Sequence, residues 1–301
     1  MQPKTIELLA GSRLLTLTGA HETYLDGVAA ARQWGDTPLM RLIKKLPVGA
    51  TYLDIGANIG LTTITAAALR PDIQITAFEP VPSNADFLDQ NIRANGITNC
   101  RVVRSAVGHA TGDVTMTDNG PWSTVDPSFG GAIEAPVTTL DDYCADHLHD
   151  VEINLIKIDV EGYEPQALVG ARLTITQWKP PIFMEFNSWT LTLVGHNPVA
   201  FACEIWEAFE VQSDGGVSLT SPVGLAHDNM VQHGCVEDVI LRLRSASALL
   251  AIATPSPRGF VIQRQTEIEC MALRAEIQAL QRSTSWRLTA PLRAAMRLVR
   301  G

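Results

Sequence analysis

Three carboxylates follow two apolar runs of the sequence, at the points where each run ends. The run INLIKIDV is almost wholly apolar until Asp159 and is followed by Glu161, and PPIFMEF places Glu185 in the corresponding position. Because the carboxyl ends of parallel strands meet at one edge of an open α/β sheet, we expect these side chains to gather there. Acids held together are costly unless a cation or a proton transfer uses them. The pattern predicts acid–base chemistry, although a helix cap or a salt bridge would explain each acid taken alone.

The loop LDIGANIG, residues 53–60, combines an acid with small residues. A dinucleotide-binding loop has the spacing GxGxxG, so that a pyrophosphate can lie against bare backbone. Here Asn58 would crowd a pyrophosphate and Asp54 would repel its charges. S-adenosylmethionine fits better, because Asp54 can attract its ammonium and sulfonium while Gly56 and Gly60 let its methionine part lie along the loop. The competing interpretation is that the acid and the glycines only shape a turn.

Two further positions favour a nucleoside at the same edge. Glu79 ends the run ITAFE, about 20 residues after Gly56, where an acid can accept both hydroxyls of a ribose. The same feature occurs in NAD sites, so Glu79 supports a nucleoside without choosing between the two. Ser105 and Ala106 come after the third apolar run and are expected to frame an adenine.

These side chains need a sheet to position them, and the sequence between about residues 50 and 245 predicts one. Short apolar runs alternate with amphipathic segments of helix length, the pattern of a parallel sheet with crossover helices. The predicted strands are TYLDI, IQITAFE, CRVVRSAV, INLIKIDV, PIFMEF and VILRLR. The predicted helices cover residues 61–70, 84–95, 164–171 and 198–209. A turn signal in VQSDGGVSL adds an antiparallel hairpin, and the predicted fold is a doubly wound α/β sheet.

Segments outside this alternation divide the chain into three parts. Residues 1–48 are expected to form one strand and a helix near 38–45, as a cap over the ligand crevice. Residues 49–245 form the α/β domain, and residues 246–301 begin with a small-residue linker and continue as helices.

A long loop inside the domain, residues 117–137, is rich in Gly, Pro, Ser and Asp. Loops of that length in a compact domain are uncommon unless they bind something. Asn119, Trp122 and Ser123 are therefore candidate acceptor-binding residues, although a merely well-packed loop is an equal alternative.

Composition bounds the class of protein. A chain of 301 residues that is 46% hydrophobic can bury a full α/β core. Its five cysteines form no CxxC pair, and no segment reaches the roughly 18 apolar residues of a membrane span, so we expect a cytoplasmic protein with reduced thiols. Residues 258–301 carry eight arginines and three glutamates, a net charge of +5, which leaves −14 on the remainder. We expect no nucleic-acid partner for such an acidic body.

Several motifs in order resemble one family. LDIGANIG, AFEPVPSN, VTTLDDY, LIKIDVEGYE and FMEF are similar to the FkbM-type S-adenosylmethionine-dependent methyltransferases, over about residues 50–190. The resemblance implies the Rossmann-like sheet of class I methyltransferases, mostly parallel with an antiparallel last strand, and O-methylation, often of a sugar or polyketide hydroxyl. The residues it implies for S-adenosylmethionine are Asp54, Gly56, Asn58, Gly60 and Glu79. The residues it implies near the methyl group and the acceptor are Asp159, Glu161 and Glu185.

The expected reaction is methyl transfer to a hydroxyl of a sugar in a surface glycan or glycolipid intermediate. Asp159 or Glu161 is the candidate base, and Glu185 is expected to orient it or to bind the acceptor. In a variant, Asp159 and Glu185 hold a divalent cation, as in catechol-type O-methyltransferases, but the sequence does not require a metal. The alternatives are a nicotinamide-dependent oxidoreductase, which would need the missing GxGxxG loop, and a catalytically silent binding module of a glycan-synthesis complex.

The C-terminal stretch STSWRLTAPLRAAMRLVRG resembles an ending of bacterial enzymes that build surface polysaccharides. Its arginines alternate with apolar residues, so a basic amphipathic helix is predicted. Such a helix can lie on the inner face of an anionic membrane or contact a glycosyltransferase. A solvated terminal helix or a frayed end is the competing interpretation.

Overall fold

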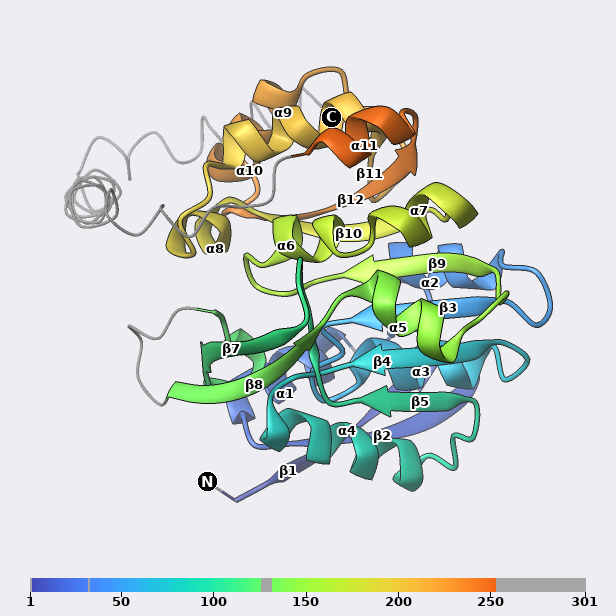
Figure 1. The fold of residues 1–301 in the computed structure, drawn as a ribbon. Helices are drawn as coiled ribbons and strands as arrows, with labels where there is room; N and C mark the ends of the chain where they lie inside the picture. Colours follow the sequence, from blue (N-terminus) through green and yellow to red (C-terminus); the bar gives the residue numbers. More distant parts are fainter. Residues whose placement is uncertain (1, 32, 126–131, 253–301) are drawn as a thin grey trace, which may run out of the picture. The chain divides into compact units, whose positions relative to one another are not determined.

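Seven strands form the central sheet, in the order β11-β12-β10-β9-β3-β4-β5 (Figure 1). The computed structural model describes residues 2–31, 33–125 and 132–252. The strands are β3 (Thr51–Ile55), β4 (Gln74–Phe78), β5 (Cys100–Val103), β9 (Ile153–Ile158), β10 (Ile182–Asn187), β11 (Phe209–Ser213) and β12 (Val236–Leu243). β12 runs antiparallel to both of its neighbours, β10 and β11, and the other strand pairs of this sheet are parallel. This confirms the predicted Rossmann-like sheet with an antiparallel last strand.

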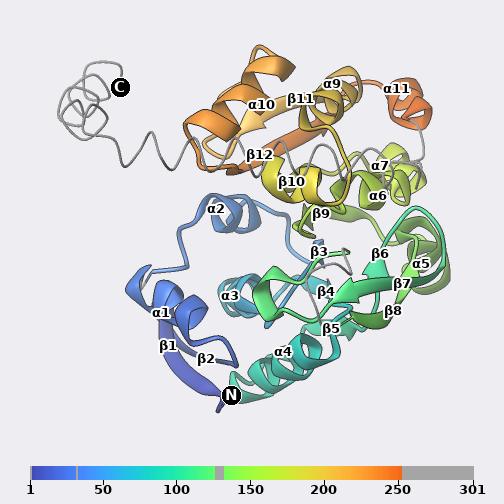
Figure 2. The ribbon, with the colours of Figure 1, turned by 90° about the vertical axis from the view of Figure 1, so that its left-hand side faces the viewer.

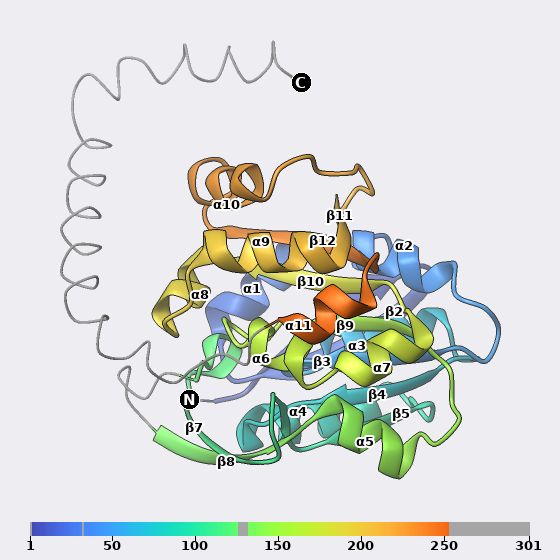
Figure 3. The same cartoon turned by 45° about the horizontal axis from the view of Figure 1, so that its top comes forward.

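The two faces of the sheet pack into separate cores, because successive strand residues point to opposite sides. Tyr52 and Leu155 lie in one core, whereas Leu53 and Ile156 lie in the other. Figure 3 shows that helices cover both faces of the sheet. Helices of the first face are α2 (Pro38–Lys44), α3 (Leu61–Leu69) and α4 (Pro82–Ala94). Helices of the second face are α5 (Leu140–His147), α6 (Glu164–Val169), α7 (Arg172–Trp178), α8 (Ser188–Leu193), α9 (Pro198–Ala208), α10 (Pro222–Val231) and α11 (Ala246–Ala251).

The N-terminal segment is more elaborate than predicted. It forms a hairpin of β1 (Lys4–Ala10) and β2 (Arg13–Gly19), then α1 (Glu22–Ala31) and the predicted helix α2. Asn91 of α4 holds the hairpin in place, since its side chain accepts a 2.8 Å hydrogen bond from the Thr18 amide and donates a 3.0 Å bond to the Thr18 carbonyl. Figure 2, which faces the carboxyl ends of the parallel strands, shows this segment along one side of that edge.

A small second sheet departs from the prediction for residues 100–138. The run CRVVRSAV does not stay in one strand: β5 ends at Val103, and β6 (Ala106–Val107) pairs with β8 (Ala132–Thr138). β8 also pairs with β7 (Gly112–Thr117), so both ends of the predicted loop are strands. A short 3-10 turn, η1 (Gly120–Trp122), lies between them.

The segment VQSDGGVSL forms the predicted antiparallel hairpin, in which Gln212 at the end of β11 pairs with Ser218. Helix α10, which was not predicted, follows this hairpin and separates β11 from β12. The predicted linker begins as helix α11, because Leu249 is fully buried against the second-face core. The predicted tail helices lie outside the described residues. No helix among the described residues is long and apolar enough to cross a membrane.

Candidate active site

A cavity of about 320 Å³ opens at the carboxyl edge of the sheet, where β3, β4 and β9 end. Most of the predicted site residues lie in its wall. On the side predicted for the methyl donor these are Gly56, Asn58, Glu79, Ser105 and Ala106. On the side predicted for the acceptor they are Trp122, Ser123, Asp159, Glu161 and Glu185. The fold therefore brings both predicted groups to one cavity, although the first comes from residues 56–106 and the second from residues 122–185.

Glu79 is 4% exposed, and its carboxylate is fixed by backbone donors. Oε2 accepts a 2.8 Å hydrogen bond from the amide of Asn58, and Oε1 accepts a 2.9 Å bond from that of Val81. Burial raises the pKa of Glu79 to about 7, although both hydrogen bonds act to lower it. Each oxygen keeps a second lone pair for a ligand. This arrangement suits the two hydroxyls of a ribose.

The loop after β3 owes its shape to residues with positive φ. Gly56 has a φ of 81°, and a Cβ atom there would lie 1.8 Å from the carbonyl oxygen of Asp159. Asn58 has a φ of 53° and lies in the wall of the cavity. Gly60 lies outside the wall, and a Cβ atom there would lie 2.5 Å from Cδ1 of Leu88. Gly60 therefore serves close packing at the start of α3, which differs from its predicted contact with the donor.

Asp54 also lies outside the wall of the cavity, where the sequence predicted that it would attract the donor. Its side chain is fully buried, and Oδ2 accepts hydrogen bonds from the hydroxyls of Thr62 (2.8 Å) and Thr63 (2.6 Å). Oδ1 lies 3.2 Å from Nζ of Lys157. The carboxylate needs these partners because an unpaired charge in a core is costly. The cation beside Asp54 in the structure is therefore Lys157.

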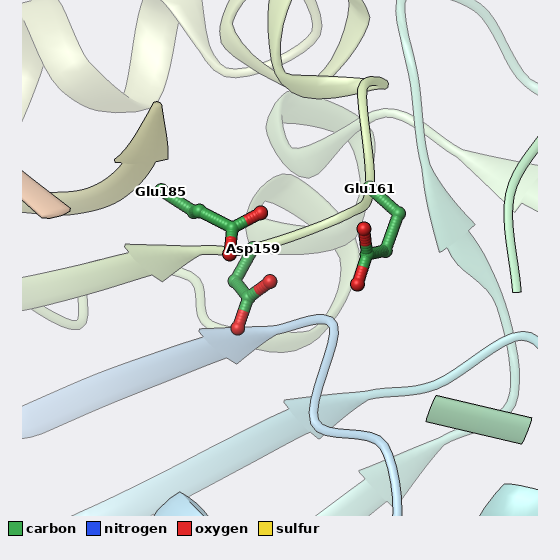
Figure 4. A group of neighbouring side chains, drawn as sticks. All are labelled: Asp159, Glu161 and Glu185. Atoms are coloured by element: carbon green, nitrogen blue, oxygen red, sulfur yellow. The ribbon is translucent and has the colours of Figure 1, made fainter. Parts of the chain in front are cut away.

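The three predicted acids gather at the acceptor end of the cavity (Figure 4). One carboxylate oxygen each from Asp159, Glu161 and Glu185 lies within 4.8 Å of the other two, a separation that also suits a cation. Burial raises the pKa of Glu161 to about 8, and the charge of Asp159 acts in the same direction. Burial, followed by the charge of Asp159, likewise raises the pKa of Glu185 well above its ordinary value. Both glutamates therefore hold protons more firmly than free carboxyls do.

A tight turn after β9 sets the direction of Glu161. Glu161 and Gly162 have φ angles of 52° and 99°. Oε1 of Glu164 accepts hydrogen bonds from the amides of Val160 (3.1 Å) and Gly162 (3.3 Å). The hydroxyl of Thr124 donates a 2.9 Å bond to the Glu161 carbonyl, so the loop predicted to bind the acceptor supports this turn.

Aromatic side chains complete the wall, and two of them come from the N-terminal segment. Tyr24 of α1 and Trp34 lie in the wall together with Trp122. Burial raises the pKa of Tyr24 to about 12, and the nearby charge of Asp159 acts in the same direction. The rings of His21 and Trp122 meet edge to face, with centroids 5.9 Å apart. The N-terminal segment thus supplies part of the wall of the cavity. Of the three residues predicted to bind the acceptor from residues 117–137, Asn119 lies outside the wall.

Sequence reasoning missed Lys157, Tyr24, Trp34 and Asn84, all of which lie in the wall. A lysine inside the apolar run INLIKIDV was a usable signal, because a buried ammonium requires nearby carboxylates. Asn84 donates a 3.1 Å hydrogen bond to the Gly120 carbonyl and so joins α4 to η1. Tyr24 and Trp34 gave no local signal, since only the packing of the N-terminal segment brings them to the cavity.

Relatives in sequence are methyltransferases, among them an O-methyltransferase and a ribosomal RNA methyltransferase. The chain is 26% identical over 181 residues to methyltransferase sdnD of Sordaria araneosa, covering 46% of this chain and 70% of that protein. It is 25% identical over 179 residues to 2-O-methyltransferase NoeI of Sinorhizobium fredii, covering 53% and 72%. A ribosomal RNA small subunit methyltransferase G of Nocardioides is 31% identical over 112 residues, covering 36% and 42%. The last match leaves the expected absence of a nucleic-acid partner without support.

The family comparison covers most of the residues that line the cavity, but not Tyr24 and Trp34. A solved structure of methyltransferase FkbM from Methylobacillus flagellatus aligns with a TM-score of 0.39 at 18% identity, covering 64% of this chain and 43% of that one. The family model described as the methyltransferase FkbM domain matches residues 54–209, which is more than half of the chain. The chain therefore belongs to the FkbM family of S-adenosylmethionine-dependent methyltransferases.

Proposed function

We propose that the protein transfers the methyl group of S-adenosylmethionine to a hydroxyl of a sugar, in a surface glycan or glycolipid intermediate. The proposal rests on the residues that line the cavity at the carboxyl edge of the sheet. At one end it holds a fixed carboxylate, Glu79, that suits a ribose. At the other end, carboxyl groups and aromatic rings lie together, a combination that suits a polyhydroxylated ring.

The donor end fits the nucleoside part of S-adenosylmethionine. Ser105 and Ala106 lie in the wall beside Glu79, where small side chains leave room for a flat base. The Ser105 hydroxyl lies 2.9 and 3.0 Å from the carbonyl oxygens of Ala106 and Pro136, which share its one proton. Gly56 and Asn58 then border the path from this region toward Asp159.

The acceptor end fits proton removal from a hydroxyl. S-adenosylmethionine supplies a good leaving group at its sulfonium, so the protein must align the acceptor oxygen and help to remove its proton. Asp159 and Glu161 are the candidate bases, and Glu185 orients the base or the acceptor. The similarity to NoeI, a 2-O-methyltransferase, supports transfer to oxygen.

A divalent cation at Asp159 and Glu185 is a second way to activate the hydroxyl. The spacing of their oxygen atoms supports it. Chelation decides between the two versions: methylation that persists after EDTA treatment removes the cation version, and loss of methylation that Mg²⁺ restores supports it.

The proposal is tested by deleting the gene in its host and comparing the surface glycans by mass spectrometry. We expect the loss of one O-methyl group from one glycan species, restored by a plasmid copy. A complementing Asp159→Asn copy should not restore it. Unchanged glycans together with a missing methyl group in ribosomal RNA would instead assign an RNA acceptor.

A further inference from the structure

One buried lysine connects the loop of the donor end to the acids of the acceptor end. Lys157 of β9 is 4% exposed, and its Nζ donates a 2.9 Å hydrogen bond to the Gly56 carbonyl. The same atom lies 3.2 Å from Oδ1 of Asp54 and 3.2 Å from Oδ2 of Asp159. Lys157 thus makes one hydrogen bond to the donor loop and an ion pair with each of the two acids.

The two acids beside Lys157 differ in what they can reach. Asp54 is fully buried, and its other oxygen is already bonded to Thr62 and Thr63. The Asp159 side chain is 38% exposed and lies in the wall of the cavity. Lys157 holds only one oxygen of Asp159, which leaves the second oxygen available to a ligand.

The other two acids lack such a cation. Within the described residues, no ion pair joins Glu161 or Glu185 to a basic side chain. Of the three acids, Asp159 alone has an ammonium of the described residues within ion-pair distance of its carboxylate. The charges around the three acids are therefore unequal, and Lys157 creates the inequality.

We infer that Asp159 is the base for the acceptor hydroxyl and that Lys157 is a positioning residue, which fixes Asp159 against the donor loop. Glu161 and Glu185 then serve as hydrogen-bonding groups for the acceptor. This inference rests on the proposed methyl transfer and names the base within it. Asp159 takes the hydroxyl proton while the oxygen forms the new bond to the methyl carbon. The electron pair of the broken carbon–sulfur bond stays on sulfur, so the positive sulfonium and the negative carboxylate are both neutralised.

Lys157 contacts both the donor loop and Asp159, so its loss should affect the reaction as well as stability. Gly56 belongs to the donor loop, and its backbone lies against the backbone of Asp159. Lys157 joins both residues from within the same strand end. A methionine at position 157 would fill similar volume but would release Asp159 from its fixed position.

The test is a double-mutant cycle of Lys157→Met and Asp159→Asn, with the surface substitution Lys45→Met as the matched control. Initial rates are measured with labelled S-adenosylmethionine and a set of methyl hexopyranosides. We expect Lys157→Met to lower kcat about 10²-fold, with less than a tenfold change in the KM for the donor. The double variant should be no slower than Asp159→Asn alone. Multiplicative losses, or a normal kcat in Lys157→Met, would overturn the inference.

Folding and function are separated by two further measurements. Lys157→Met leaves the buried Asp54 carboxylate without its cation. The double variant Asp54→Asn/Lys157→Met, which removes both charges, is therefore prepared as well, and it should show the same loss of kcat. The cycle is also repeated on urea unfolding of the S-adenosylhomocysteine complex, which needs no acceptor. If the unfolding energies are non-additive but no sugar is methylated, the proposed function is contradicted and the coupling of Lys157 to Asp159 still stands. Additive energies would overturn the role of Lys157.

Discussion

Oε2 of Glu79 accepts a 2.8 Å hydrogen bond from the backbone amide of Asn58, so the acid at the end of β4 is bound to the loop that follows β3. Two segments about 20 residues apart in sequence thus form one rigid wall. The carboxylate is positioned before any ligand arrives, which lowers the entropic cost of binding.

Glu79→Gln should therefore weaken the binding of S-adenosylhomocysteine. An amide can present only one acceptor oxygen to a diol and to two backbone amides, so we expect Kd to rise roughly tenfold to a hundredfold. Isothermal titration calorimetry measures the change. The exposed substitution Glu152→Gln is the control and should leave Kd unchanged. Equal affinities of Glu79→Gln and the wild-type protein would remove Glu79 from the donor site.

Gly56→Ala should destabilise the protein more than Gly96→Ala does. Both glycines have positive φ, 81° and 63°, so both alanines carry backbone strain of about 1–2 kcal/mol. At Gly56 the new methyl group would also lie 1.8 Å from the Asp159 carbonyl oxygen, whereas nothing lies within 4 Å at Gly96. Urea unfolding should show an additional loss of roughly 2 kcal/mol or more for Gly56→Ala. Equal losses would mean that the two backbones can separate without cost.

The free energy of unfolding of the ligand-free protein should fall as the pH rises from about 5 to 8.5. Burial raises the pKa of Glu164 to about 7, above the value near 4.5 of a free glutamate. The folded state therefore binds the proton more tightly, so this contribution is complete below the unfolded pKa and is lost as pH rises through the folded pKa.

Glu164→Gln tests that origin. The substitution removes one titrating group and should raise stability at pH 8.5 by about 1–3 kcal/mol relative to the wild-type protein, with a smaller effect at pH 5. Thermal unfolding across the pH range measures it, with Glu152→Gln as the exposed control. A melting temperature that rises with pH over this window would contradict the protonated state of the buried glutamates.

Tyr24→Phe should affect the acceptor and spare the donor. Tyr24 reaches the cavity from α1 and lies close enough to Asp159 for the charge of that carboxylate to act on the pKa of its hydroxyl. Loss of its hydroxyl should lower kcat/KM for the acceptor by about tenfold, which corresponds to one hydrogen bond. The KM for S-adenosylmethionine should stay within about twofold of the wild-type value. Thr23→Ala, an exposed change on the same helix, is the control. A loss confined to donor binding would place Tyr24 at the other end.

The sequence predicted the central sheet and the acids at its edge because both depend on local patterns. TYLDI and INLIKI are buried strands, and a residue that follows such a strand must emerge at the carboxyl edge. This is why Glu79 and Asp159 were found. Asp54 was correctly predicted to lie near the carboxyl edge of the sheet. Its ion pair with Lys157 was not predicted, because Lys157 appears in sequence only as one polar residue in an apolar run.

The parts that were missed depend on contacts between distant segments. Tyr24 and Trp34 reach the cavity only because the hairpin of β1 and β2 packs on α4 through Asn91. Helix α10 carries an N-cap, Ser221, whose side chain accepts a 3.0 Å hydrogen bond from the Gly224 amide. That signal was present in the sequence, but it was not read as the start of a helix after the hairpin.

The identity of the atom that receives the methyl group tests the central claim most directly. Purified protein is incubated with S-adenosylmethionine labelled with ¹³C in the methyl group and with glycans from its host, and the product is examined by ¹H–¹³C NMR. The account predicts a labelled methyl ether on a sugar oxygen, which is absent with Asp159→Asn. Label on nitrogen, on carbon or on RNA would contradict sugar O-methylation.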